Sequence, residues 1–146
     1  MGVCTKKYNG IEDSIMTECR IYPWVDLTKE RPNKVLDIRD AAWDTGATQT
    51  LISGSVIRHL NLKPIGRCQV DGFDGSKLAN EYLIHVGLPT GDAVLNIKAL
   101  ECDGAAYDVV IGMDIISKGD FCFTNKDNKS VFSFRLPSKE HIELKD

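Results

Sequence analysis

The chain has 146 residues, of which 42% are hydrophobic and 27% are charged, and its formal net charge is −3. This composition is that of an ordinary globular domain, and the weak negative charge gives no support for nucleic-acid binding. No apolar run approaches the roughly 18 residues that a membrane-spanning helix needs. We therefore expect one folded domain with neither a nucleic-acid nor a membrane partner.

The N-terminus carries no targeting signal that we can identify. No apolar stretch follows the first ten residues, and Lys6 stands where a myristoylation pattern requires Ser or Thr. The five cysteines are scattered and form no C-x-x-C pair, and the three histidines lie far apart. We predict a cytoplasmic protein with reduced thiols and neither a metal nor a cofactor, with His59, His85 and His141 at the surface or in helices.

In chain order, the pattern predicts many short strands separated by turns. Residues 1–18 form either a mobile arm or an irregular first strand. Extended segments follow at residues 18–27, 34–43, 66–73, 76–88, 93–101, 107–111, 121–124 and 130–136. Asp-Gly at residues 74–75 predicts a hairpin turn between two of these segments. The spacing is typical of an all-β barrel or sandwich.

Two short helices interrupt the strands. The first follows a strand end within residues 50–60, with Ser53 or Ser55 as its N-cap and a buried face of Val56, Ile57 and Leu60. The second is a single turn at residues 114–118, for which we predict Asp114 as the cap and Gly119 as the end. Trp24 and Trp43 are expected in the core or at an interface.

The segment with the clearest chemistry is Asp44-Thr45-Gly46-Ala47, which follows an apolar strand directly. Gly46 has no Cβ, so the backbone can turn sharply beside the carboxylate and its N–H groups can reach the Asp44 oxygens. The small neighbours of Asp44 would let two such loops meet face to face. The alternative is that this tripeptide is simply a turn.

Two carboxylates about 3 Å apart share one proton, because both cannot ionise cheaply. One then activates a water as a base while the other polarises a carbonyl, which gives hydrolysis without a metal. The chain has one such motif, so this chemistry requires a second copy, and an isologous dimer supplies it. The terminal strands, including residues 130–136, are candidates for the dimer sheet, and the alternative for residues 130–136 is a core strand.

The order of these features resembles the retropepsin-like family of aspartic proteases, in its bacterial or other cellular branch. Residues 43–53 (WDTGATQTLIS) resemble the active-site loop of the family, and residues 107–116 (YDVVIGMDII) resemble its second signature. The resemblance runs from about Val35 to Leu136. It implies an all-β acid-protease barrel that is active as a symmetric homodimer on peptide substrates.

The resemblance also implies roles for individual residues. Asp44 would be the catalytic aspartate, Thr45 would bond across the dimer, and Gly46 and Ala47 would complete the loop. The second signature, Ile111 and Gly112, would pack around that loop. The hairpin with its tip at Phe73, Asp74 and Gly75 would be the flap that closes over substrate, or else an ordinary surface turn.

Two residues depart from the pattern of many viral members. Met113 stands where they have Arg, and the flap tip carries Phe73 and Asp74 where they are rich in glycine. A module of the same fold that binds peptides or dimerises but cleaves poorly is therefore an alternative. A third is a monomeric hydrolase that uses two carboxylates of one chain. We divide the chain into an arm (1–18), the protease domain (19–137) and a solvated tail (138–146).

Overall fold

The computed structural model describes residues 2–72, 75–102 and 106–146. Its elements in chain order are β1 (Gly2–Lys7), β2 (Ile15–Pro23), β3 (Leu36–Trp43), β4 (Leu51–Ile52), α1 (Gly54–His59), β5 (Gly66–Gly72), β6 (Gly75–Gly87), β7 (Ala93–Glu101), β8 (Val109–Ile111), α2 (Met113–Ile116), β9 (Asp120–Thr124), the 3-10 turn η1 (Lys126–Asn128) and β10 (Val131–Leu136). The expected all-β architecture with two short α-helices is confirmed.

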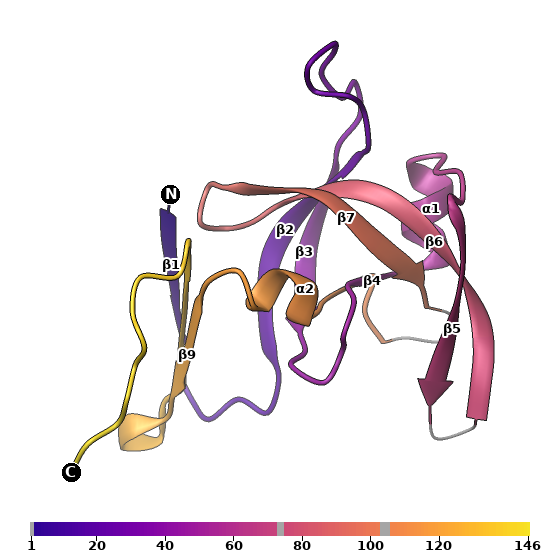
Figure 1. Cartoon of the computed structure of the whole chain (residues 1–146). Coiled ribbons are helices and arrows are strands. Elements are labelled where there is room, and N and C mark those ends of the chain that lie inside the picture. Colours follow the sequence, from indigo (N-terminus) through magenta and orange to yellow (C-terminus); the bar gives the residue numbers. More distant parts are fainter. Residues whose placement is uncertain (1, 73–74, 103–105) are drawn as a thin grey trace.

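Seven strands form one sheet in the order β2-β3-β8-β4-β7-β6-β5. A further pairing of β2 with β6 closes this sheet into a barrel, and the β5–β6 hairpin extends from it (Figure 1). The three residues of β8 are all buried, because β3 and β4 flank this strand and the core covers its faces. The expected burial of this short apolar strand on both faces is confirmed.

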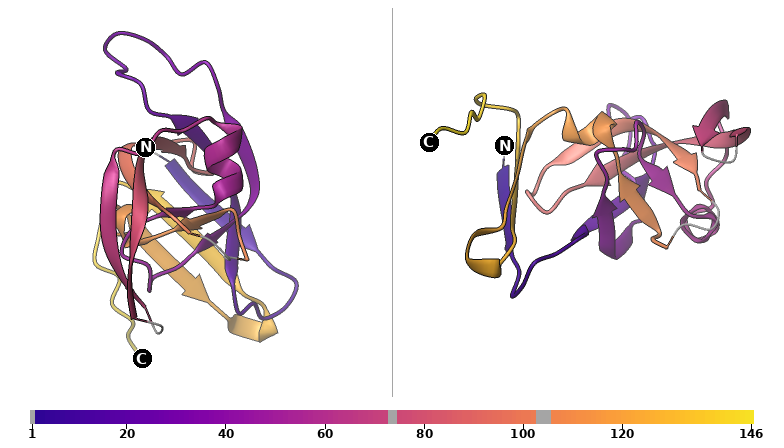
Figure 2. Two further views of the ribbon diagram at one scale, coloured as in Figure 1. Left: turned by 90° about the vertical axis from the view of Figure 1, so that its right-hand side faces the viewer. Right: turned by 90° about the horizontal axis from the view of Figure 1, so that it is seen from below.

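The remaining three strands form a separate sheet in the order β1-β10-β9, which lies beside the barrel (Figures 1 and 2). Phe132 and Phe134 of β10 are fully buried, and the ring of Trp43 packs 5.0 and 4.9 Å from their rings. Residues 2–7 thus form a regular strand, paired with β10 along its whole length. Trp43, as expected, is a core residue, whereas Trp24 is 43% exposed.

Local sequence accounts well for the first helix. The Ser53 hydroxyl accepts a hydrogen bond from the Val56 N–H, so Ser53 is the N-cap. The three apolar residues expected on the inner face are buried: Val56, Ile57 and Leu60. The prediction of Ser53 as the N-cap and the prediction of the buried face are both confirmed.

The prediction for His85 was wrong, because this residue is buried in β6 and only 3% exposed. One ring nitrogen, Nδ1, accepts a hydrogen bond from the Asn96 N–H at 3.1 Å, and Nε2 lies 3.2 Å from the Val25 carbonyl oxygen. The pair of backbone partners compensates the loss of water around the ring. His59 and His141 are exposed.

Candidate active site

Asp44 stands at the end of β3, directly after the buried Trp43. β3 pairs in parallel with β8, so that Trp43 lies opposite Ile111, and the Asp44 N–H donates to the Ile111 carbonyl at 2.9 Å. The next residue in register is therefore the exposed Asp44, with its backbone fixed and its carboxylate in solvent. The strand pairing brings together two segments that the sequence separates by more than 60 residues.

The loop after Asp44 forms hydrogen bonds back to Asp44. The Gly46 N–H donates to Asp44 Oδ1 at 2.7 Å, and the Ala47 N–H donates to the Asp44 carbonyl at 3.2 Å. A Cβ on Gly46 would lie 3.1 Å from the same Oδ1 atom, so a larger residue here would require the carboxylate to shift slightly. The backbone therefore orients the carboxylate, in the manner that the Asp-Thr-Gly motif predicts. Thr45 is exposed and available to another chain.

Residues of the second signature donate backbone hydrogen bonds to this loop. The Met113 N–H donates to the Ala47 carbonyl at 2.7 Å, and the Asp114 N–H donates to the Thr48 carbonyl at 3.2 Å. Gly112 permits the contact, because a Cβ there would lie 2.7 Å from the Gln49 carbonyl oxygen and 2.8 Å from that of Ala47. The expectation that Ile111 and Gly112 pack around the loop agrees with this geometry.

Thr50 and Asp114 form a clamp that sequence reasoning did not identify. Thr50 is fully buried; its N–H donates to Asp114 Oδ2 at 2.9 Å and its hydroxyl to Asp114 Oδ1 at 2.8 Å. The hydroxyl also accepts from the Gly112 N–H at 3.3 Å. The prediction of Asp114 as the helix cap was wrong: the N-cap of α2 is Gly112, and the Asp114 carboxylate turns to the loop instead. These bonds support the loop with an apolar residue, Met113, at the position after Gly112.

Gln49 links the loop to the strands beneath the hairpin. Its amide nitrogen donates to Glu81 Oε2 at 3.2 Å and to the Lys98 carbonyl at 3.1 Å, and the Cys68 thiol lies 3.9 Å from its amide oxygen. These partners come from β5, β6 and β7, so one side chain connects the Asp44 loop to three strands. No local pattern identifies this role, which depends on a long-range contact.

The comparisons with known proteins agree with this geometry. Residues 39–118 match the model of the family described as "gag-polyprotein putative aspartyl protease". The match covers more than half of the chain and includes both the Asp44 loop and the second signature. The chain belongs to this family. No curated protein matches it in sequence.

Among solved structures, the fold is similar to that of a retropepsin-like aspartic protease from Rickettsia conorii. The TM-score is 0.56 at 14% identity, and the match covers 90% of this chain and 91% of the other. A Legionella pneumophila protein of unknown function also matches, with a TM-score of 0.38 at 17% identity over 70% of this chain and 83% of that one. The first likeness supports the retropepsin-like fold of this family member.

The hairpin of this family member is formed by β5 and β6. The two strands pair continuously from Gly66 opposite Glu81 to Gly72 opposite Gly75. Gly75 has φ of +97°, a conformation that side chains rarely adopt. The expected hairpin is confirmed, while Phe73 and Asp74 at its tip lie outside the described residues.

The described residues contain no group of three or more side chains that could hold a metal ion. In the same part of the chain, no helix is both long and apolar enough to cross a bilayer. All five cysteines are free, and burial raises the pKa of the Cys19 thiol to about 12. Within the loop, the carboxylate that the backbone orients is that of Asp44.

Proposed function

We propose that the protein is a homodimeric aspartic endopeptidase in which each copy contributes Asp44. The observation that supports this most is the double support of the Asp44 loop, by its own Gly46 N–H and by the backbone of the second signature. This support fixes the direction of a carboxylate that is exposed and has no ion-pair partner among the described residues. An oriented, exposed and unpaired Asp44 carboxylate is suited to pairing with the Asp44 carboxylate of a second copy.

The mechanism follows from the approach of the two carboxylates. At a separation of about 3 Å they hold one proton between them, so the pair titrates in two steps that belong to neither residue alone. The ionised member takes a proton from a water molecule, and the protonated member donates to the carbonyl oxygen of the peptide bond. The tetrahedral intermediate then breaks to release the amine, which takes up a proton from the pair.

The neighbouring residues have supporting roles in this proposal. Thr45 bonds to the partner copy below the pair, and Gly46 and Ala47 form the wall of the substrate channel. The hairpin tip at Phe73, Asp74 and Gly75 closes over an extended peptide, which adds as a strand. Closure excludes water from the reacting bond, and specificity then lies in pockets for alternate side chains.

The direct test is Asp44→Asn, assayed on a library of peptides from acidic to neutral pH. We expect cleavage to fall by at least about 10³-fold, because the base and acid functions are both lost with the carboxylate pair. The matched control is Asp40→Asn, which changes an exposed carboxylate of β3, four residues before Asp44. Normal cleavage by Asp44→Asn would disprove the assignment.

The alternative is a module of the same fold that binds peptides without cutting them. Met113, in place of the Arg of many viral members, is the observation that favours it. A pepstatin-type inhibitor distinguishes the two: saturable binding together with no cleavage at any pH supports the binding module. The Thr50–Asp114 clamp favours the enzyme, because it supports the loop without an Arg.

A further inference from the structure

The hairpin formed by β5 and β6 has two faces of different character. Along β5, Cys68 and Val70 are half-buried, whereas Arg67, Gln69 and Asp71 are exposed. Successive side chains of a strand point to opposite faces, and the pairing of β5 with β6 has no register shift. One face of the hairpin is therefore turned toward the rest of the chain, and the other is turned toward solvent.

The half-buried face lies on the side of the Asp44 loop. The Cys68 thiol is 3.9 Å from the Gln49 amide oxygen, and the Gln49 amide nitrogen donates to Glu81 Oε2 at 3.2 Å. Gln49 belongs to the segment between β3 and β4 that begins with Asp44. We call this half-buried face the inner face of the hairpin. In the proposed function, an extended peptide lies between the inner face and Asp44.

The inner face carries a lysine. Lys77 is opposite Val70 in the register and four residues before Glu81, so all three side chains share the inner face. Lys77 is exposed and has no ion-pair partner among the described residues. Glu81, the carboxylate on the same face, is hydrogen-bonded to Gln49 instead. The inner face is therefore positively charged toward the end of the hairpin.

The position of Lys77 along the hairpin fixes which part of a peptide it would meet. Lys77 is two residues from Gly75, where β6 begins, and at the usual rise of an antiparallel strand this is about 7 Å. An extended peptide covers the same length in two residues. Because each copy of a two-fold dimer contributes one hairpin, a Lys77 side chain would lie on each side of the bond to be cut.

We propose that Lys77 determines substrate specificity, by selecting peptides that carry Glu or Asp within about two residues of the cleaved bond. This inference rests on the proposed function, because closure of the hairpin over a peptide is what brings Lys77 to the substrate. Closure also removes water, which strengthens the attraction between the ammonium group and a carboxylate. A Lys or Arg side chain at the same place in the peptide would be repelled, which adds to the selectivity.

Val70 refines the expected substrate. It faces Lys77 across the hairpin, and facing residues of an antiparallel pair have Cβ atoms about 4.5–5.5 Å apart. The same place on the inner face thus offers an apolar surface beside a cation. A glutamate has an apolar stem that ends in a carboxylate, so it matches both groups.

Digestion of a decapeptide library at pH 6 and low salt, with the cut sites identified by mass spectrometry, tests the proposal first. We expect Glu and Asp to be enriched within two residues of the cut. A well-cleaved peptide is then compared with its counterpart in which Glu is replaced by Gln. We expect kcat/KM to be roughly 5-fold higher for the Glu peptide, the ratio of a favourable exposed ion pair. Raising the salt to about 1 M should reduce this ratio, because the Debye length falls to about 3 Å.

Two variants of Lys77 and a matched control locate the effect. Lys77→Gln should bring the Glu-to-Gln ratio to about 1, and Lys77→Glu should reverse the preference in favour of Lys and Arg. Arg67→Glu makes the same change of charge on the outer face of the same hairpin, where the side chain is exposed. It should keep the preference for Glu. A preference that Lys77→Glu leaves unchanged, or that Arg67→Glu removes equally, would overturn the proposal.

The pH dependence gives a second, independent measurement on the wild-type chain. The carboxyl group of a peptide Glu has a pKa of about 4.3, so below about pH 4 the Glu peptide loses the charge that Lys77 attracts. The ratio of kcat/KM for the Glu and Gln peptides should therefore approach 1 at pH 3.5. A ratio that stays the same from pH 6 to pH 3.5 would show that charge does not determine the preference.

The outcomes separate this inference from the proposed function. A wild-type chain that cleaves peptides with no preference for Glu or Asp retains the proposed function and overturns the role of Lys77. If the wild-type chain cleaves no peptide, the proposed function fails, and fluorescence polarisation with two labelled decapeptide mixtures, one containing Glu and the other Gln, decides the inference. Tighter binding of the Glu mixture that Lys77→Gln abolishes supports the role of Lys77, whereas equal or absent binding overturns it.

Discussion

At the scale of single residues, the conformation of the Asp44 loop depends on close approach of the backbone more than on side-chain contacts. Gly112 lets the second signature touch the carbonyl groups of Ala47 and Gln49, and the hydrogen bonds of Met113 and Asp114 follow from that contact. Glycine is needed for space, since a side chain at this position would meet backbone atoms that have little room to move.

Gly112→Ala is expected to destabilise the fold by about 1–3 kcal/mol, the usual cost of overpacking, and to lower peptide cleavage. Urea unfolding at constant protein concentration measures the change. Gly10→Ala is the matched control, because a Cβ there would have nothing within 4 Å; its stability should stay within about 0.5 kcal/mol of the wild type. Equal stability of the Gly112 and Gly10 variants would contradict this account of the loop.

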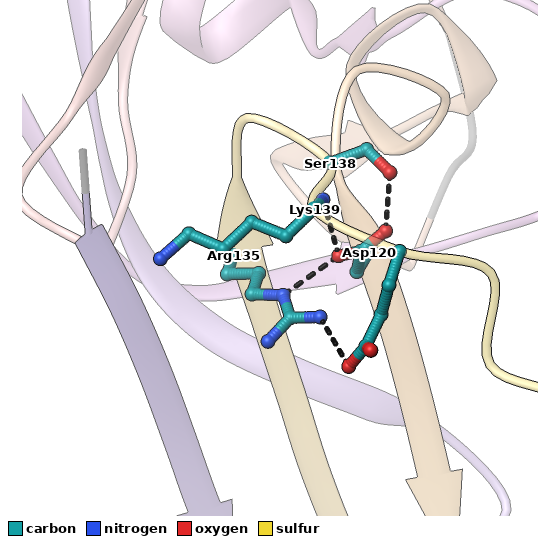
Figure 3. A network of polar contacts seen from close by, with 5 residues as sticks. Asp120, Arg135, Ser138 and Lys139 are labelled. Atoms are coloured by element: carbon teal, nitrogen blue, oxygen red, sulfur yellow. Dashed lines mark hydrogen bonds and ion pairs between the residues drawn. The ribbon is translucent and has the colours of Figure 1, made fainter.

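At the scale of elements, the start of β9 is tied to the C-terminal residues through Asp120 (Figure 3). The Arg135 guanidinium donates to Asp120 Oδ2 at 2.6 Å and the Lys139 N–H donates to the same atom at 2.8 Å, while the Ser138 hydroxyl donates to Oδ1. Arg135 also pairs with Glu140 at 3.1 Å. These bonds hold the segment after β10 across the beginning of β9.

The Ser138 hydroxyl, the Lys139 N–H and Arg135 hold the pKa of Asp120 well below its usual range. A carboxyl group with a lowered folded-state pKa stabilises the fold above its unfolded pKa of about 4, and this contribution is lost as the pH falls toward the folded-state pKa. The stability difference between wild type and Asp120→Asn should therefore be full at neutral pH and should shrink below about pH 4.

Urea unfolding from pH 3 to pH 7 measures this difference, and limited proteolysis of the C-terminal residues reports the release of the tail. Asp40→Asn serves as the control, since its carboxylate makes no hydrogen bond or ion pair to the described residues. A difference for Asp120→Asn that stays constant across the whole pH range would show that the charge of this group does not hold the tail.

At the scale of the whole molecule, one copy combines the barrel, the three-stranded sheet and the Asp44 loop, and in our proposal it contributes half of an active site. The loop directly follows Trp43, which belongs to β3 of the barrel but packs on β9 and β10 of the smaller sheet. The proposed enzyme is complete only when two such halves meet, so its activity must depend on the mixture of copies present.

Subunit mixing tests this dependence. If Asp44→Asn copies are added to an equal amount of wild-type chain and allowed to exchange, random pairing leaves about half of the wild-type copies in fully wild-type dimers. We expect cleavage to fall to about half, and further as more of the variant is added. Added Asp40→Asn copies are the control and should not lower cleavage, because this variant keeps Asp44. Cleavage that ignores added Asp44→Asn would indicate a site within one chain.

Much of the site could be predicted from local sequence, because its chemistry is encoded over a few residues. Asp44, Thr45 and Gly46 specify an oriented carboxylate in a turn, and Ser53 specifies a helix start. The all-β fold likewise followed from short strands and turn residues. In these cases the physical cause, a backbone conformation or a cap, acts between neighbours in the chain.

Other features could be identified only in the folded chain. They are contacts between segments that are distant in sequence, and no local pattern encodes which residues meet. The clamp between Thr50 and Asp114 spans 64 residues, and it reassigned Asp114 from helix cap to loop support. The burial of His85 depends on partners from two other segments. The central place of β10, between β1 and β9, is decided only by the order of strands in the sheet.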